Sequence, residues 1–416
     1  MQSVQANEAE LRIEVDSPTP AILEILPAAA DGAKGMPLAH AESPDGPFHS
    51  LHVAGLKPST TYRYRATAGG ETREGSLTTA PPDDTKAPIS FLIYGDNRTN
   101  DDAHASVVHA MLDAPGEFLI NSGDLVGNGG DPRRWQRFFD IEQPLIGSRC
   151  LYSAIGNHEL HESTGANFLK YFGDDDPTLI GLRRLYRTVR WGNIRFFFLN
   201  GLDDFTSSDE RKWLDAELAK GDAEADLQWR IIVVHHGPWS SSLHGNNLKI
   251  RNGGLLEVFR AHKIDLVVSG HDHVYERGDA DGLLYLVSGG GGAPLYKVGA
   301  PIPSTRSGES TYHFIEARVD GDTFAMTAIR PNGTHIESCF FHKGSSWECP
   351  TSSAVSGDSG AAWKPTDDVI FDENRGKPTK RSRCGCTLPG LRAGSANPAA
   401  LAFLACVALL RRRRRT

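Results

Sequence analysis

The sequence predicts an α/β fold preceded by a smaller all-β module. Two observations carry this prediction. After residue 88, short apolar runs alternate with stretches of helical spacing, which is typical of sheets with helices on both faces. Before residue 82, short alternating segments are separated by frequent turn residues, which is typical of β-strands. The 416 residues are enough for two or three domains with a sizeable core.

The first predicted domain is residues 1–82. Residues 11–15 alternate between apolar and polar side chains, as a half-buried strand does. Residues 49–58 end in a Leu-Lys-Pro turn and lead into a second predicted strand at residues 60–67. Residues 81–84, two prolines followed by two aspartates, are the expected hinge to the next domain.

The second predicted domain, residues 88–345, alternates strands with helices. Apolar and β-branched runs predict buried strands at residues 89–94, 117–122, 151–155, 230–234 and 264–268. Helical spacing predicts helices at residues 103–113, 133–143, 209–219 and 254–262. Glycines beside the carboxyl ends of the strands indicate turns, which place the polar residues after each strand at the sheet edge.

Residues of the types that bind metal ions follow all five predicted strands. The clusters are Gly95-Asp96-Asn97-Arg98, Gly123-Asp124, Gly156-Asn157-His158-Glu159, His235-His236-Gly237 and Gly270-His271-Asp272-His273. One such cluster alone is more often a turn or a solvated pair, but five in this order favour a shared site. Ligands collect at the carboxyl edge of open α/β sheets. Oxygen and imidazole donors without thiolates suit iron, manganese or zinc.

This set of motifs resembles the calcineurin-like metallophosphoesterases over residues 88–345. The longer motif from Gly270 to Arg277 and the glycine-rich run 286–292 resemble the purple acid phosphatase branch in particular. The N-terminal module, with Leu-Lys-Pro before a strand bearing Tyr-Arg-Tyr, is similar to a fibronectin type III domain. The resemblance implies a four-layer α/β/β/α sandwich and two metal ions, which are iron, zinc or manganese.

The resemblance also implies a role for each candidate residue. The implied metal ligands are Asp124 as the bridge, Asp96 and His273 for the first ion, and Asn157, His235 and His271 for the second. His236 is the alternative to His235 as a ligand. His158 lies outside the ligand shell and serves the leaving oxygen as a proton donor or electrostatic stabiliser. His244, nine residues after His235, contacts the substrate.

Two positions depart from the family pattern. Arg98 stands where the superfamily has a histidine, and Gly127 stands where the purple branch has a tyrosine. The first ion is therefore one protein ligand short on either template, and without a tyrosinate on ferric iron we expect a protein that is not purple. The alternatives for the missing donor are water, Asn97, Asn128 and His104. Arg98 can also contact the substrate phosphate, because a guanidinium matches phosphate geometrically.

The expected activity is hydrolysis of phosphate esters at a binuclear metal centre. Two ions polarise the phosphoryl oxygens and lower the pKa of water, and a carboxylate between them offsets part of their charge. We expect a phosphomonoesterase that acts on a phosphorylated small molecule. The alternatives are a phosphodiesterase for nucleotides or lipid head groups, and a catalytically weak surface binding module. The net charge of −8 is spread along the chain, which gives no indication of nucleic-acid binding.

The C-terminal residues carry a different pattern. Residues 346–383 are rich in Ser, Gly and charge, as a disordered linker is. The predicted tail, residues 384–416, holds Cys384 and Cys386, an apolar run at 398–410 and a cluster of five arginines at 411–415. Thirteen helical residues span about 20 Å, short of the roughly 30 Å of a bilayer core. The tail resembles the sorting tails of myxobacterial surface proteins, which implies membrane contact before processing.

A sorting tail implies a secreted or surface-anchored protein. The first ten residues lack the apolar run of a signal peptide, so we expect the signal to lie upstream of this start. In an oxidising compartment, Cys339 and Cys349 are candidates for a disulfide that closes a short loop. Cys150 is expected to be a buried thiol. The sequence leaves the oligomeric state open.

Overall fold

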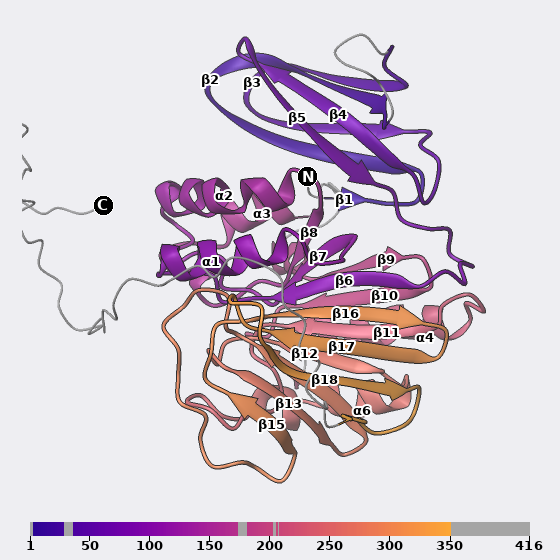
Figure 1. Cartoon of the computed structure of the whole chain (residues 1–416), viewed down its shortest axis with the longest axis vertical. Helices are drawn as coiled ribbons and strands as arrows, with labels where there is room; N and C mark the ends of the chain where they lie inside the picture. Colours follow the sequence, from indigo (N-terminus) through magenta and orange to yellow (C-terminus); the bar gives the residue numbers. More distant parts are fainter. Residues whose placement is uncertain (1–2, 29–35, 174–180, 203–204, 207, 351–416) are drawn as a thin grey trace, which may run out of the picture. The chain divides into compact units, whose positions relative to one another are not determined.

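The computed structural model describes residues 3–28, 36–173, 181–202, 205–206 and 208–350, all of them within one compact unit, Met1–Ala362 (Figure 1). The strands are β1 (Ser3–Val4), β2 (Glu8–Pro27), β3 (Ala39–Ala54), β4 (Thr61–Ala68), β5 (Glu71–Thr78), β6 (Ile89–Tyr94), β7 (Phe118–Asn121), β8 (Cys150–Ser153), β9 (Arg187–Trp191), β10 (Ile194–Leu199), β11 (Trp229–Val234), β12 (Leu266–Ser269), β13 (Tyr275–Ala280), β14 (Leu283–Ser288), β15 (Thr305–Glu309), β16 (Phe314–Asp320), β17 (Thr323–Ile329) and β18 (His335–His342). The helices are α1 (Asp101–Met111), α2 (Pro132–Ile146), α3 (Ala166–Phe172), α4 (Asp209–Asp222), α5 (Leu248–Asn252) and α6 (Leu255–Ala261).

The N-terminal strands β1–β5 form one antiparallel sheet. The order is β1-β2-β4-β5, with β3 also paired to β2. The register of β2 against β3 shifts between Glu14 and Ala21, where Pro18 and Pro20 stand in the strand, because proline cannot donate to a ladder. The sheet agrees with an all-β module. Since these five strands lie in one sheet, the fibronectin type III sandwich stays a prediction.

Two sheets form the centre of the remaining chain. The six-stranded sheet has the order β18-β17-β16-β6-β7-β8, and the seven-stranded sheet has the order β15-β13-β14-β12-β11-β10-β9. Strands β6, β7 and β8 run parallel, as do β10, β11 and β12. Parallel strands end at the same edge, so the residues that follow them in sequence are brought together.

The side chains of the central strands divide the structure into layers. From β6, Phe91 and Ile93 enter a core that they share with Phe196 of the other sheet. The alternate residues Leu92 and Tyr94 pack with α1, α2 and α3, which lie beside β6–β8 (Figure 1). Helices α4 and α6 cover the second sheet through a third apolar cluster. The arrangement is helix, sheet, sheet, helix, and the predicted α/β fold is confirmed.

After residue 88, the predicted helices and strands lie within a few residues of the observed ones, whereas the strand predicted at residues 11–15 is part of the much longer β2. Helix α1 begins at Asp101, two residues earlier than predicted, because the side chain of Asn100 caps it by accepting from the amide of Ala103. Helix α2 continues to Ile146 with Pro144 inside its last turn. After residue 88, strands β9, β10, β13, β14 and β15–β18 were not predicted. In β16 and β17, buried residues alternate with less buried ones, which suits a sheet with one solvated face better than the fully buried runs of the parallel strands.

The N-terminal sheet contacts the α/β part through specific hydrogen bonds. The Tyr152 hydroxyl donates to the carbonyl of Val4 at 2.8 Å and accepts from the amide of Val4 at 3.1 Å. The Tyr64 hydroxyl donates to the carbonyl of Gly147 at 3.1 Å, and Glu14 accepts from Tyr171. These bonds fix the sheet on the side of β8. The predicted boundary at residues 82–88 stays a prediction.

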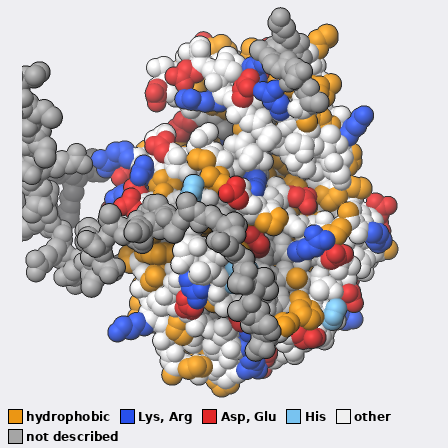
Figure 2. Space-filling view, viewed as in Figure 1, with side chains coloured by type: hydrophobic (Ala, Val, Ile, Leu, Met, Phe, Trp, Pro, Cys, Tyr) orange, Lys and Arg blue, Asp and Glu red, His pale blue; other side chains and the backbone are white. Residues whose placement is uncertain are grey.

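The cysteines follow the expected pattern where they are described. Cys339 and Cys349 form a disulfide, and Cys150 is a buried free thiol whose pKa burial raises to about 11. Within the described part of the chain, no helix has the length and apolar character needed to cross a membrane. The predicted linker and sorting tail lie outside the described residues. Figure 2 shows basic and acidic side chains interspersed over the visible face.

Candidate metal centre

Five strand ends meet at one edge, and the predicted ligands lie in the loops that follow them. Asp96 follows β6, Asp124 follows β7, and Asn157 follows β8 in the six-stranded sheet. His235 follows β11, and His271 and His273 follow β12, in the seven-stranded sheet. Atoms of Asp96, Asp124 and His235 lie within 4.8 Å of one another, and all three side chains are buried. The structure therefore unites residues from both sheets at one point.

The backbone at this point adopts unusual conformations. Asp96, Asp124 and His271 have positive φ values of 58°, 55° and 69°. Such φ values cost residues with a side chain on the order of 1 kcal/mol each, and they cluster at functional sites. Gly156 is required next to Asp124, because a Cβ on it would lie 2.2 Å from the Asp124 carboxylate. The loops thus hold three predicted ligands in conformations that packing alone does not explain.

Four histidines present the same ring nitrogen to the centre. The Nδ1 atoms of His235, His273 and His158 donate to the backbone carbonyls of Ser122, Pro294 and Gly127, at 2.9, 2.6 and 2.9 Å. The Nδ1 atom of His244 lies 3.0 Å from a carboxylate oxygen of Asp272. Because Nδ1 is engaged, Nε2 is the atom that faces the centre, which is the usual arrangement for ligating histidines.

The donors predicted for the second ion are available to a metal. Nε2 of His235 lies 3.3 Å from the Asp124 carboxylate. The Asn157 side-chain oxygen is buried and has no hydrogen-bond partner among the described residues. The His271 ring lies 5.1 Å from the His235 ring and 4.3 Å from the His236 ring. One carboxylate, one amide oxygen and two imidazoles fit a transition-metal ion.

The donors predicted for the first ion are contacted by Arg98. Its Nε donates to Asp124 at 3.2 Å, and its Nη2 lies 3.3 Å from Nε2 of His273. Nε2 of His273 is also 3.5 Å from the Asp96 carboxylate. These three ligand residues fit a metal ion, but they supply one protein donor fewer than the second site.

The alternatives for the missing donor are engaged elsewhere. The Asn97 side-chain oxygen accepts from Asn121 at 2.6 Å, and the Asn128 side-chain oxygen accepts from the amide of Gly130 at 2.9 Å. His104 is hydrogen-bonded to buried Glu142 at 2.7 Å, between α1 and α2. Each of these three side chains is therefore hydrogen-bonded to a residue other than the predicted metal ligands.

The residues predicted to handle the substrate flank the centre. The amide of His158 donates to Asp124 at 3.0 Å, and its Nε2 lies 3.9 Å from the same carboxylate. The His244 ring lies 4.1 Å from the His271 ring and is about one third exposed, at 35%. Residues 240–252, which include His244, are called the substrate loop below. The two histidines thus approach the centre from opposite sheets.

Three buried carboxylates that the sequence analysis did not single out support the centre. Glu159 accepts hydrogen bonds from the amides of Asp124, Val126 and Gly156. Asp272 accepts both the amide and the ring of His244, at 2.9 and 3.0 Å. Glu276 accepts the amide and hydroxyl of Ser241, which ties the substrate loop to β13. The indication that the sequence offered for these three carboxylates is that they stand inside the motifs around Asn157 and from Gly270 to Arg277.

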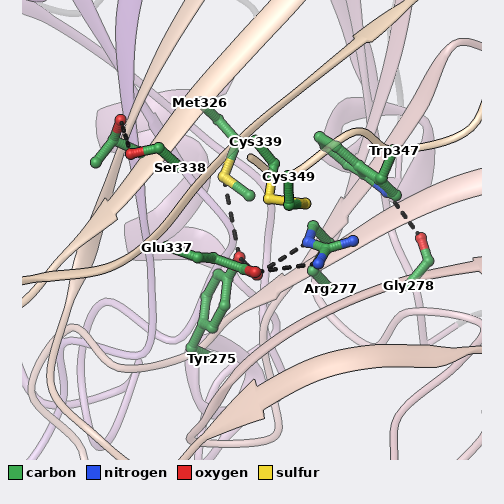
Figure 3. The surroundings of a disulfide bond; sticks show 10 residues. Tyr275, Arg277, Gly278, Met326, Glu337, Ser338, Cys339, Trp347 and Cys349 are labelled. Atoms are coloured by element: carbon green, nitrogen blue, oxygen red, sulfur yellow. Dashed lines mark hydrogen bonds and ion pairs between the residues drawn. A yellow bond between two sulfur atoms is a disulfide. The ribbon is translucent and has the colours of Figure 1, made fainter. Parts of the chain in front are cut away.

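The far end of the long motif is anchored at the disulfide. Arg277 donates to both carboxylate oxygens of Glu337, at 2.9 and 3.0 Å, and Tyr275 donates to the same carboxylate (Figure 3). Glu337 lies on β18, two residues before Cys339. The motif therefore joins the metal centre to the last strand of the other sheet.

Electrostatics in the centre favour the ligand forms of most groups. Burial raises the pKa of Asp124, but His235, His158 and Arg98 outweigh it and hold that pKa well below its usual range. Burial and the Arg98 charge lower the pKa of His273 to about 3. Burial lowers the pKa of His235, but Asp124 and Asp96 outweigh it and raise that pKa to about 9. A metal ion must therefore displace a proton from His235.

Comparisons with known proteins agree with this geometry. A family model described as Calcineurin-like phosphoesterase matches residues 89–275. Purple acid phosphatase 22 of Arabidopsis thaliana is 28% identical over 269 residues, 59% of this chain and 59% of that protein. An uncharacterized protein of Mycobacterium tuberculosis is 28% identical over 265 residues, 54% of this chain and 50% of that protein. The chain spans between half and three fifths of the length of these relatives.

Two solved structures share the fold. The purple acid phosphatase PPD1 from yellow lupin seeds matches with a TM-score of 0.67 at 16% identity, over 82% of this chain and 73% of that chain. The structure of PhoD matches with a TM-score of 0.68 at 10% identity, over 86% of this chain and 92% of that chain. Residues 89–275 are therefore similar to the calcineurin-like phosphoesterases, and purple acid phosphatases are among the proteins that this chain resembles.

Proposed function

We propose that the chain hydrolyses phosphate monoesters at a binuclear metal centre. The observation that carries this proposal is the convergence on one carboxylate, Asp124. Groups from three other loops reach it: His235 at 3.3 Å, the amide of His158 at 3.0 Å and Arg98 at 3.2 Å. A buried carboxylate at such a point can serve as the shared ligand of two divalent ions, because it offsets part of their charge.

Each residue has a distinct part in this chemistry. When bound, the ions would polarise the phosphoryl oxygens and lower the pKa of water. Asp124 is the residue that would hold both ions, and its carboxylate would offset part of their charge. His158, held by the carbonyl of Gly127, faces the centre with Nε2 and donates a proton to the leaving oxygen. His244 and Arg98 bind the phosphate oxygens, since both are hydrogen-bond donors at the rim of the centre.

The first experiment combines metal analysis with two substrates. At saturating metal we expect two ions per chain, with faster turnover of p-nitrophenyl phosphate than of bis(p-nitrophenyl) phosphate. Faster turnover of the diester would replace the monoesterase proposal with the phosphodiesterase alternative. Fewer than one ion per chain and no turnover of either ester would favour the binding-module alternative and overturn the enzyme proposal.

Two substitutions separate the roles. Asp124→Ala removes the shared ligand, so both ions and the activity should be lost. His158→Ala should keep the metal and lower kcat by about 100-fold, as loss of an acid catalyst does. The matched control is His161→Ala, an exposed histidine on the same loop, which should leave metal content and kcat unchanged. Loss of metal in His158→Ala would contradict the role proposed for this residue.

We also propose that the protein works outside the cytoplasm, secreted or anchored at the cell surface, and that its C-terminal tail contacts the membrane before processing. The Cys339–Cys349 disulfide supports an oxidising compartment. Its substrate is proposed to be a phosphorylated small molecule, and the mixed charges in Figure 2 favour no polyanion on that face. Cell fractionation of the producing organism tests the location, and recovery of the protein only in the cytosol would contradict it.

A further inference from the structure

The two halves of the metal centre differ in how free their donors are. The side-chain oxygen of Asn157 is buried without a hydrogen-bond partner among the described residues. Nδ1 of His235 is held by a carbonyl, so its Nε2 is directed at the Asp124 carboxylate. The donors of the second site are therefore preorganised for an ion.

The donors of the first site are already hydrogen-bonded to a cation. Nδ1 of His273 donates to the carbonyl of Pro294 at 2.6 Å, so Nε2 carries the lone pair. Nη2 of Arg98 lies 3.3 Å from that lone-pair nitrogen, and Nε of Arg98 donates to Asp124 at 3.2 Å. A lone pair cannot bind a metal ion and accept an N–H bond at once, so an ion in this site competes with the guanidinium.

Arg98 is held in this position by its surroundings. Its side chain is only 10% exposed, and Asp124 is 1% exposed, so the ion pair is largely removed from water. A charge-assisted hydrogen bond of this kind is roughly twice as strong as a neutral one. In the described residues, Asn97, Asn128 and His104 are bonded elsewhere and supply no compensating donor.

We propose that the metal centre is unequal: the second site retains its ion, whereas the first site takes an ion only when Arg98 releases Asp124 and His273. The released guanidinium, which remains beside the centre, is then free to bind the phosphate of the substrate. This inference rests on the proposed function, because it concerns the same centre. It makes Arg98 a built-in competitor of the first ion, with the consequence that activity depends on free metal even after the second site is full.

The test is a Mn²⁺ titration of the metal-free protein by calorimetry, with metal analysis after gel filtration. We expect one retained ion per chain and a second that binds at least about 100-fold more weakly, because it must break two charge-assisted bonds. His273→Ala should remove only the weak ion. Asn157→Ala should remove the retained ion, which assigns that ion to the second site.

Substitution of Arg98 tests the cause. Arg98→His replaces the competitor with a donor, so two ions should be retained. Arg98→Ala removes the guanidinium without adding a donor and should tighten the weak ion by about 100-fold, because both hydrogen bonds that compete with the ion are lost. The control is Arg133→His on the exposed start of α2, with one ion retained as in the native chain.

The outcomes separate this inference from the proposed function. The inference would be overturned if the native chain bound two ions with equal affinity. It would also be overturned if neither Arg98 variant bound the first ion more tightly than the native chain does. Either result would leave the proposed phosphoesterase activity intact. A native chain that binds no Mn²⁺ and hydrolyses neither ester would overturn the proposed function itself. Thermal unfolding of each variant identifies any loss of metal that comes from misfolding, and Arg98→Ala is then decisive because it adds no bulk.

Discussion

Replacing Glu159 should loosen the two loops that carry Asp124 and Asn157, which are predicted metal ligands. This carboxylate is fully buried and follows β8. One of its oxygens accepts from the amides of Asp124 and Gly156, at 3.0 and 2.8 Å, and the other accepts from the amide of Val126 at 3.2 Å. A single side chain therefore satisfies three backbone donors in loops of two different strands.

The cost of removing it follows from these three bonds. A buried donor without a partner costs about 1–3 kcal/mol, so Glu159→Ala should lower the free energy of unfolding by at least about 3 kcal/mol. Glu159→Gln keeps one acceptor oxygen but places the amide NH2 group against the remaining backbone donors, so it should lower the free energy of unfolding by about 1–2 kcal/mol. Glu162→Gln, at an exposed position three residues later, is the matched control and should change stability by less than about 0.5 kcal/mol.

Urea unfolding of the metal-free proteins measures these differences without a contribution from bound ions. A Mn²⁺ titration then measures the effect on the centre. We expect Glu159→Ala to weaken the second site by about 10–100-fold, the usual effect of losing a group that supports metal ligands. The reasoning is refuted if the alanine variant unfolds within about 1 kcal/mol of the native chain, because three unpaired amides cannot cost so little.

Four further predictions concern other parts of the chain. Asp272→Asn, which releases the His244 ring, should raise KM for p-nitrophenyl phosphate by about tenfold with metal content unchanged. Burial lowers the pKa of His262, but hydrogen bonds to two aspartates outweigh it and raise that pKa above the ordinary value for histidine. The charged ring therefore stabilises the protein at a pH below the ordinary pKa, and this stabilisation is lost as the pH rises through the raised pKa. The difference in Tm between the native chain and His262→Gln should be larger near about pH 5.5 than near about pH 9. Cys339→Ser should cost about 2–3 kcal/mol in thermal unfolding, as expected for so short a loop. With Gly127 in place of tyrosine, the iron-loaded protein should show no visible charge-transfer band.

The sequence predicted the parts of the fold that depend on local pattern. Fully buried strands read as continuous apolar runs, and β6, β11 and β12 were predicted on that basis to within two residues. The antiparallel strands β16–β18 were missed because their apolar pattern is weaker, and because β16 joins the sheet through β6, which lies more than 200 residues earlier in the chain. The arrangement of β2–β5 in one sheet depends on register shifts beside prolines, which residue composition does not encode.

The candidate site was predictable for a different reason. Aspartate, asparagine and histidine are residue types that bind metal ions, and parallel strands bring the residues that follow them together at one edge of the sheet. The supporting carboxylates carry no such mark, because Glu159 and Asp272 look like ordinary polar loop residues until their burial is known. The Arg98 contacts could not be predicted either. A long side chain has many rotamers, and only the packed structure selects the one that reaches both Asp124 and His273.

The stretch from Gly270 to Arg277 shows why position within a motif matters as much as residue type. His271 faces the donors proposed for the second ion and His273 those of the first, while Asp272 between them turns to the substrate loop. Farther along, Glu276 holds the same loop and Arg277 holds β18 beside the disulfide. Successive residues point to different partners, so an insertion of one residue here would exchange metal, loop and strand contacts together. Such a segment tolerates changes in its partners more readily than changes in its own length.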